Sequence, residues 1–296
     1  MGLNVTIVGG GLAGLIAARV MREHHNVTVL EKYSGNHEVG AALNLGPTGV
    51  AIVDKLGFSR EKCGSVVAKS VKSYNKHGQL LRETDMTPFT KFSNADWIFQ
   101  HRADLWNEFL RLATAPSEDL GIRGEPAKVV YGKDVVKVNV ESGDVHLSDG
   151  EILHPDLVIG ADGIKSVVRP VVVEQEDFVS ARPSGSSAFR FMLTTEQVRN
   201  VHGDIPLLDN SKPASLDVHL ALDPTNRSIV MYPCRNWEYI NFVCIAQDKM
   251  LGKKTEESWT AEGDKGDLLR CFEDFGPYVL DLLKCVQTRK QPQCMS

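Results

Sequence analysis

A glycine-rich turn near the N-terminus constrains the fold of this chain more than any other feature. Residues 9–14 follow a short apolar run that reads as a buried strand, and they precede residues 15–21, which read as a helix. A second apolar run then ends in Glu31. Strand, glycine turn, helix, strand and acid, in this order, are typical of a dinucleotide-binding unit.

Each glycine of the turn has a physical task in such a unit. Gly9 permits the tight turn, Gly11 lets the backbone approach a pyrophosphate, and Gly14 lets the helix lie close to the strand. The N–H groups at the start of the helix would then face the phosphates. Glu31 would accept hydrogen bonds from a ribose diol, and its carboxylate disfavours a phosphate on that ribose.

Composition and charge exclude several classes of partner. The length of 296 residues allows one large or two interleaved domains, and the net charge of -5 gives no reason to expect nucleic acid or a membrane surface. No apolar run approaches the roughly 18 residues of a membrane span. The six cysteines are scattered without metal-ligand spacing, so we expect a reduced, metal-free, cytoplasmic protein.

The pattern of apolar residues changes along the chain. The first half predicts helices near 48–56 and 102–115, strands around a turn at 76–78, a hairpin over 135–147 and a strand over 157–159. After about residue 171 the segments 188–193, 216–222, 228–232 and 240–246 are strand-like, and 268–284 predicts one or two helices broken at Gly276-Pro277. The sequence therefore predicts an α/β protein, with a parallel nucleotide-binding half followed by a mostly antiparallel, β-rich half.

A second motif distinguishes between dinucleotides. Residues 160–169 read Gly-Ala-Asp-Gly, then a serine at 166 and Arg169. With the glycine turn, this segment resembles the FAD-dependent aromatic hydroxylases, the flavoprotein monooxygenases typified by salicylate hydroxylase and para-hydroxybenzoate hydroxylase. The resemblance implies that Asp162 and Gly163 lie near the FAD pyrophosphate and that Arg169 anchors their loop.

Two further segments are similar to the same family. The run His101-Arg102-Ala103-Asp104-Leu105 looks like its HRxDL element, whose arginine, here Arg102, reaches the flavin nucleotide. Residues 40–47 are similar to the stretch that passes beside the flavin ring. The resemblance thus implies the following cofactor-binding residues: Gly9, Gly11, Gly14, Glu31, Lys32, Ala42, Arg102, Asp162 and Gly163.

The family also implies a domain plan. We expect a Rossmann-like FAD-binding domain of the para-hydroxybenzoate hydroxylase type, interleaved with a β-rich substrate domain. The FAD-binding domain would comprise 1–72 and 99–172, and 73–98 would be an excursion of the substrate domain. The β-rich substrate domain would comprise 173–262, followed by C-terminal helices and an irregular tail over 263–296.

The later half offers two candidate catalytic residues. Residues 185–190 resemble the strand that places an arginine over the substrate cavity, and 231–235 resemble the YPxR strand of the same sheet. The resemblance implies that Arg190 holds a phenolate or carboxylate and that Tyr232 lines the pocket. The alternatives are a surface ion pair for Arg190 and a core position for Tyr232.

The implied activity is hydroxylation of a phenolic or other aromatic small molecule with O2. In this family NADH or NADPH reduces FAD transiently, and the oxygen is transferred from a C4a-hydroperoxyflavin. Relatives carry a third flavin element, GDAAH, after the β-rich half, and no Gly-Asp pair of this chain is followed by that run. We therefore expect a truncated form with weaker FAD retention.

Two other functions stay open at this point. One is a truncated, catalytically impaired flavin- or nucleotide-binding paralogue, which the missing GDAAH element favours. The other is an NAD-dependent dehydrogenase without flavin, against which the motif at 160–169 argues. The sequence leaves open the substrate, the choice between NADH and NADPH, and the oligomeric state.

Overall fold

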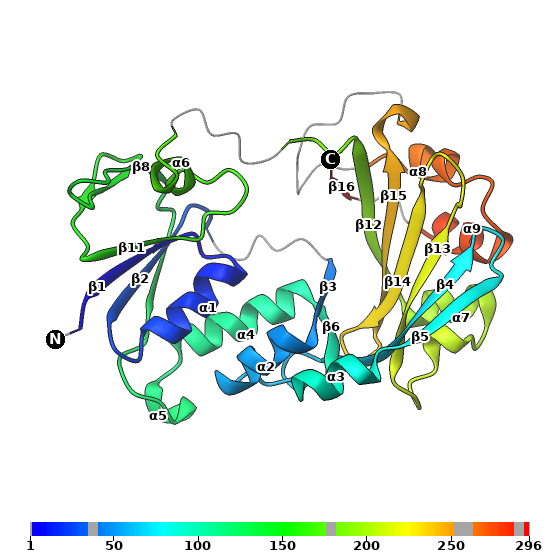
Figure 1. Cartoon of the computed structure of the whole chain (residues 1–296), viewed down its shortest axis with the longest axis horizontal. Coiled ribbons are helices and arrows are strands. Elements are labelled where there is room, and N and C mark those ends of the chain that lie inside the picture. The colour runs from blue at the N-terminus through cyan, green and yellow to red at the C-terminus, as the bar shows by residue number, and fades with distance from the viewer. Residues whose placement is uncertain (1, 35–40, 176–181, 252–262, 287–292, 296) are drawn as a thin grey trace. The chain divides into compact units, whose positions relative to one another are not determined.

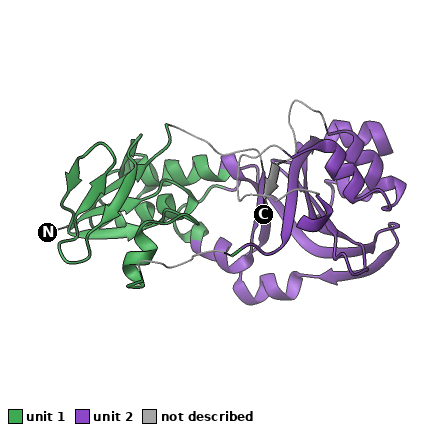
Figure 2. Ribbon diagram, turned by 90° about the horizontal axis from the view of Figure 1, so that it is seen from above, with its two compact units in different colours: residues 1–38, 53–59, 105–182 green, residues 39–52, 60–104, 183–296 purple. Residues whose placement is uncertain are grey.

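The computed structural model describes residues 2–34, 41–175, 182–251, 263–286 and 293–295. Within them the chain divides into two compact units, coloured separately in Figure 2. Unit 1 comprises residues 1–38, 53–59 and 105–182, and unit 2 comprises 39–52, 60–104 and 183–296. No helix in the described ranges is both long and apolar enough to cross a bilayer.

Unit 1 is built on a four-stranded parallel sheet of order β11-β1-β2-β7. Strands β11, β1 and β2 are labelled in Figure 1. Its strands are β1 (Asn4–Val8), β2 (Asn26–Glu31), β7 (Lys128–Tyr131) and β11 (Leu157–Gly160). Its helices are α1 (Leu12–Met21), α5 (Ser117–Leu120), α6 (Val168–Val172) and most of α4 (Arg102–Thr114). The predicted order of strand, glycine turn, helix and strand is confirmed.

A small antiparallel sheet covers part of this parallel sheet. It has the order β10-β9-β8, with β8 at Val135–Val138, β9 at Val145–Leu147 and β10 at Ile152–Leu153. Its valines and leucines pack with Val8, Leu30 and Val168 in one apolar cluster. The hairpin predicted over 135–147 is therefore present, and it closes the apolar face of the nucleotide-binding sheet.

Unit 2 contains a nine-stranded sheet. Eight of its strands follow one another in the order β16-β12-β15-β14-β13-β4-β6-β3, and the ninth, β5, pairs with β4. Its strands from the first half of the chain are β3 (Ala42–Leu45), β4 (Val66–Asn75), β5 (Leu80–Asp85) and β6 (Trp97–His101). Those from the second half are β12 (Ser186–Thr194), β13 (Ala214–Leu220), β14 (Ser228–Cys234), β15 (Tyr239–Gln247) and β16 (Gln293–Met295).

In the second half of the chain, β12 pairs with β15, β15 with β14 and β14 with β13, all antiparallel, as the prediction of a mostly antiparallel half expects. β4, from the first half of the chain, pairs with β13 in parallel. In addition, the tail expected to be irregular includes β16, which pairs antiparallel with β12. The intervening residues 287–292 lie outside the described ranges.

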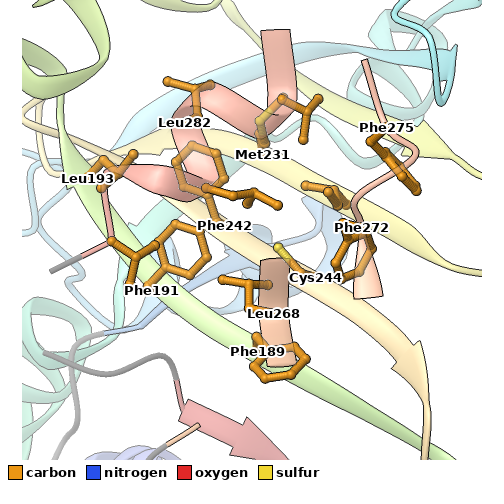
Figure 3. Packing of buried hydrophobic residues seen from close by; sticks show 14 of the residues in the cluster. Phe189, Phe191, Leu193, Met231, Phe242, Cys244, Leu268, Phe272, Phe275 and Leu282 are labelled. Atoms are coloured by element: carbon orange, nitrogen blue, oxygen red, sulfur yellow. The ribbon is translucent and has the colours of Figure 1, made fainter. Parts of the chain in front are cut away.

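Helices cover one face of the nine-stranded sheet. They are α7 (Thr195–His202), α8 (Lys265–Cys271) and α9 (Pro277–Lys284). Two further helices, α2 (Pro47–Lys55) and α3 (Thr87–Ser93), come from the first half of the chain. Every second residue of β12, namely Phe189, Phe191 and Leu193, packs against this helical layer (Figure 3). Burial of each such side chain stabilises the folded state by about 1.5–3 kcal/mol. Helices α8 and α9 are separate, as the break at Gly276-Pro277 predicts.

The opposite face of the sheet carries a second apolar cluster. Trp97, Phe99 and Tyr232 lie in it, and Met192 and Leu216 pack against it. Phe189 and Phe191 point to the helical layer, and side chains alternate across a strand, so Arg190 between them lies on this opposite face. This face is the one that bears the candidate substrate residues.

Candidate functional site

The three motif glycines of the turn after β1 meet different surroundings. Gly9 has a φ of +105°, and a Cβ added there would lie 2.4 Å from the carbonyl oxygen of Ala161. A Cβ on Gly14 would lie 1.9 Å from the carbonyl oxygen of Gly9. A Cβ on Gly11 would meet no described atom within 4 Å. The protein's own packing therefore requires glycine at 9 and 14, whereas Gly11 leaves open space beside the backbone.

The start of α1 has the electrostatics of an anion site. Gly11 is its N-cap, in an extended conformation, and among the described residues no side chain caps it. The first amides of a helix have no intrahelical acceptor and carry the positive end of its dipole. Open space at Gly11 and uncapped amides beside it fit a diphosphate that approaches the backbone closely.

Glu31 lies at the end of β2, directly against the glycine turn. Its Oε2 accepts a hydrogen bond from the Gly10 amide at 2.8 Å, and its Oε1 accepts one from the Tyr33 amide at 3.0 Å. A carboxylate has about four acceptor positions, so both oxygens retain capacity for a ribose hydroxyl. Lys32 is exposed, and its ammonium lies 4.9 Å from the centre of the Tyr33 ring.

The Gly-Ala-Asp-Gly segment forms a loop closed by its own side chains. Asp162 accepts hydrogen bonds from the Ser166 hydroxyl at 2.6 Å and from the Val167 amide at 2.7 Å. Arg169 donates to the Gly163 carbonyl at 2.8 Å, in agreement with its expected anchoring role. Because β1 and β11 are parallel neighbours, this loop and the glycine turn share the carboxyl edge of the sheet, where open α/β sheets bind ligands.

Trp106 supports the glycine turn, a role that the sequence pattern does not predict. It lies on α4 and is 6% exposed, and its indole Nε1 donates to the Gly10 carbonyl at 2.8 Å. This hydrogen bond joins α4 to the glycine turn and holds the carbonyl group of Gly10 in place. The helical spacing around 102–115 indicates only that Trp106 is buried, because the pattern carries no information about which backbone group its N–H meets.

Ala42 and Arg102 lie in unit 2, where two hydrogen bonds hold the chain at Ala41-Ala42. The Arg102 amide donates to the Ala41 carbonyl at 2.9 Å, and the Ala42 amide donates to Oδ1 of Asn241 at 3.1 Å. β3 and β6 pair so that Ala42 is opposite His101. Gly40, the first residue of the stretch expected beside the flavin ring, lies outside the described residues.

Arg190 and Tyr232 share the aromatic face of the nine-stranded sheet. Tyr232 is 4% exposed and its ring centre lies 4.6 Å from that of Phe99. Burial lowers the pKa of the Arg190 guanidinium; Tyr232 opposes this shift and the like charge of Arg102 adds to it. Burial raises the pKa of Tyr232, so its phenol is neutral at ordinary pH. Arg190 and Arg102 repel each other electrostatically, and Arg190 is partly desolvated, so the binding of an anionic ligand there is favoured.

The structure thus groups the expected site residues in two sets. Unit 1 contains one set, near the edge of the parallel sheet: Gly9, Gly11, Gly14, Glu31, Lys32, Asp162 and Gly163. Unit 2 contains the other: Ala42, Arg102, Arg190 and Tyr232. Among the described residues no group of three or more His, Cys, Asp or Glu side chains is placed to hold a metal ion.

Comparison with known proteins gives the same assignment as the motifs. A family profile described as an FAD binding domain matches residues 2–264. Hispidin-3-hydroxylase from Neonothopanus nambi is 30% identical over 297 residues, which cover 96% of this chain and 68% of that protein. A salicylate hydroxylase from Pseudomonas putida is 29% identical, covering 97% of this chain and 65% of its own length. The chain thus spans about two thirds of these relatives.

Solved structures confirm the fold. The structure of CtdE in complex with FAD and a substrate matches with a TM-score of 0.75 at 19% identity, covering 99% of this chain and 68% of that one. A salicylate hydroxylase substrate complex matches with a TM-score of 0.72 at 20% identity, covering 100% and 68%. The family profile and the similar hydroxylases, together with the open space beside the Gly11 backbone, show that the chain belongs to the FAD-dependent flavoprotein monooxygenases that include salicylate hydroxylase, with FAD as its cofactor.

Proposed function

We propose that this chain hydroxylates a phenolic or other aromatic small molecule, with NADH or NADPH as transient reductant and O2 as oxidant. The observation that carries the proposal is a partly desolvated cation, Arg190, on a sheet face that is otherwise made of aromatic and apolar side chains. Such a face suits an aromatic ring that bears a negative oxygen. The relatives named as hydroxylases of hispidin and salicylate support the same class of substrate.

FAD, when bound, supplies the reduction by NAD(P)H and the activation of O2. In unit 1, the amides around Gly11 would hold its diphosphate and Glu31 would accept a ribose hydroxyl, with Lys32 beside it. The loop at Asp162-Gly163 would border the diphosphate from the neighbouring strand. In unit 2, Ala42 would border the flavin ring and Arg102 would reach the flavin nucleotide.

The protein's part in the chemistry is to bind, orient and keep dry the aromatic substrate. Arg190 would pair with a phenolate or carboxylate, which lowers the pKa of a phenol and makes its ring a stronger nucleophile. Tyr232 would line the ring and could donate its neutral O–H, because burial raises its pKa. We place this activity in the cytoplasm, where thiols such as those of Cys234 and Cys244 stay reduced.

The test is an aerobic assay of FAD-loaded protein with salicylate, 4-hydroxybenzoate, phenol and resorcinol. Hydroxylated product that carries label from 18O2, together with substrate-dependent NAD(P)H oxidation, supports the proposal. R190M should raise KM for an anionic substrate at least tenfold, whereas R199M, at an arginine 49% exposed on α7, should leave it unchanged. FAD binding without any substrate-dependent oxidation would instead favour the nucleotide-binding alternative.

A further inference from the structure

Asn241 is a buried amide on the face that carries Arg190 and Tyr232. It lies in β15 and is 1% exposed. The strand register places it opposite Met192 of β12 on one side and opposite Tyr232 of β14 on the other. Arg190 is opposite Val243, two residues along β15, and is therefore a diagonal neighbour of Asn241.

Only one end of the Asn241 amide is satisfied. Oδ1 accepts the hydrogen bond from the Ala42 amide at 3.1 Å. The orientation is fixed by chemistry, because a backbone N–H needs an acceptor and the amide nitrogen is only a donor. Among the residues that the structure describes, Nδ2 has no hydrogen-bond partner, although it is fully buried.

An unsatisfied buried donor is costly, because it has lost its hydrogen bonds to water without gaining another. A leucine or methionine at this position would avoid that cost, and the neighbouring Met192 shows that the face accepts apolar side chains. The cost is recovered when a ligand supplies an acceptor. The position of Asn241 beside Tyr232 and diagonal to Arg190 therefore points to a ligand on this face.

We propose that Asn241 is a substrate-binding residue, whose Nδ2 donates a hydrogen bond to an oxygen of the aromatic substrate. Oδ1, held by Ala42, fixes the plane of the amide and so aims Nδ2. The inference rests on the proposed function and narrows its substrate class. Nδ2 and the Arg190 guanidinium are donors only, so the substrate carries acceptor oxygens, as in a phenolate, carboxylate or carbonyl.

This arrangement also explains how analogues are rejected. A site that is built to hydrogen-bond a substrate group leaves its own buried donors unpaired when that group is missing. Anilines and alkylbenzenes, which offer no strong acceptor, should bind much more weakly than phenols and benzoates of the same size.

The test compares N241D and N241L with the wild type, all loaded with FAD. N241D keeps an acceptor for the Ala42 amide but replaces the donor with a second acceptor, whereas N241L removes both. N200D is the matched control, because Asn200 is exposed on α7. Salicylate, 4-hydroxybenzoate, phenol and resorcinol are titrated by calorimetry, and the tightest wild-type ligand is carried through all variants.

We expect N241D and N241L to raise the Kd of that ligand at least tenfold at pH 8, and N200D to leave it within twofold. The Kd of FAD in N241D should stay within twofold of the wild type, because the bond to Ala42 is kept. Below about pH 6 the buried carboxyl introduced by N241D is protonated and regains an O–H donor. Its ligand affinity should then recover, whereas that of N241L should not, a difference that a merely structural role would not produce.

The two proposals fail in different ways. A wild-type protein that loads FAD and binds none of the four aromatics overturns the proposed function, and the inference falls with it. A wild type that binds one of them, with N241L binding it equally well, overturns the role of Asn241 alone. Loss of affinity in N241D without recovery at low pH also overturns the donor role.

Discussion

Arg235 and Asp104 form a two-point ion pair, with Nε 3.0 Å from Oδ2 and Nη2 3.1 Å from Oδ1. The pair joins the turn between β14 and β15 to the first turn of α4, where Arg102 lies. That turn is strained, because Arg235, Asn236 and Trp237 all have positive φ, between +50° and +66°. The arginine of the YPxR segment is thus a support for the HRxDL segment, a relation that neither motif reveals by itself.

This ion pair should be energetically coupled. R235M and D104N should each lower the free energy of unfolding by about 1–3 kcal/mol, because the partner that remains is only partly exposed to water. A double-mutant cycle by urea denaturation should give a coupling energy of about 1–2 kcal/mol. The pair of Arg199 and Asp204, whose side chains are 49% and 88% exposed, is the control and should couple by less than about 0.5 kcal/mol.

G11A and G14A should separate cofactor binding from folding. G11A adds a methyl group where no described atom lies within 4 Å, so its stability without FAD should change by less than about 1 kcal/mol. Its affinity for FAD, measured by quenching of flavin fluorescence, should fall at least tenfold. G14A places a Cβ 1.9 Å from the Gly9 carbonyl oxygen and should destabilise the protein itself. Equal FAD affinity in G11A and wild type would contradict the diphosphate site.

His219 should make the protein sensitive to acid. Its ring is 2% exposed and stacks on Tyr74, with ring centres 4.8 Å apart, and burial lowers its pKa to about 4. The unfolded chain takes up a proton near pH 6.5, whereas the folded protein does so only near pH 4. Stability is therefore lost as pH falls through this window, by up to about 3 kcal/mol.

H219F should remove this loss, as denaturation curves at pH 7 and pH 4.5 can show. The raised pKa of the nearby Asp217, which burial causes, works in the opposite direction. The quantity to compare is therefore the difference between wild type and variant at each pH, in which the contribution of Asp217 cancels. A difference that does not change with pH would exclude His219 as the source.

R22M should be among the most destabilising substitutions in unit 1. Arg22 is 0% exposed and donates to the carbonyls of Leu112 at 3.1 Å and Ala115 at 2.7 Å, near the end of α4. Without the guanidinium these helix-end carbonyls lose their buried donors, at a cost of about 3–5 kcal/mol. R82M, at an exposed arginine of β5, should change the unfolding free energy by less than about 0.5 kcal/mol.

Local signals made the nucleotide-binding unit predictable. The order of β1, glycine turn, α1 and β2 depends on residues that are neighbours in sequence, and so does the break between α8 and α9. The start of helix α7 also has a local signal in the sequence, because Thr194 and Gln197 form a capping box.

Strand pairing between distant segments could not be predicted in the same way. Alternation of apolar residues tells which side chains share a face, but not which strand lies alongside. The parallel pairing of β4 with β13, and the bond from Ala42 to Asn241, both join segments from opposite halves of the chain. The candidate role of Asn241 can be recognised only from the structure, in which its Oδ1 accepts the hydrogen bond from the Ala42 amide.

The β4–β13 pairing also sets an order of events on the ribosome. β4 leaves the exit tunnel long before β13 exists, and translation at about 5–20 residues per second leaves a wait on the order of ten seconds. During that wait one edge of β4 displays unpaired amides and carbonyls to other nascent chains. Slow synthesis between these two strands should therefore increase aggregation, and a chaperone that shields β4 should raise the yield of folded protein.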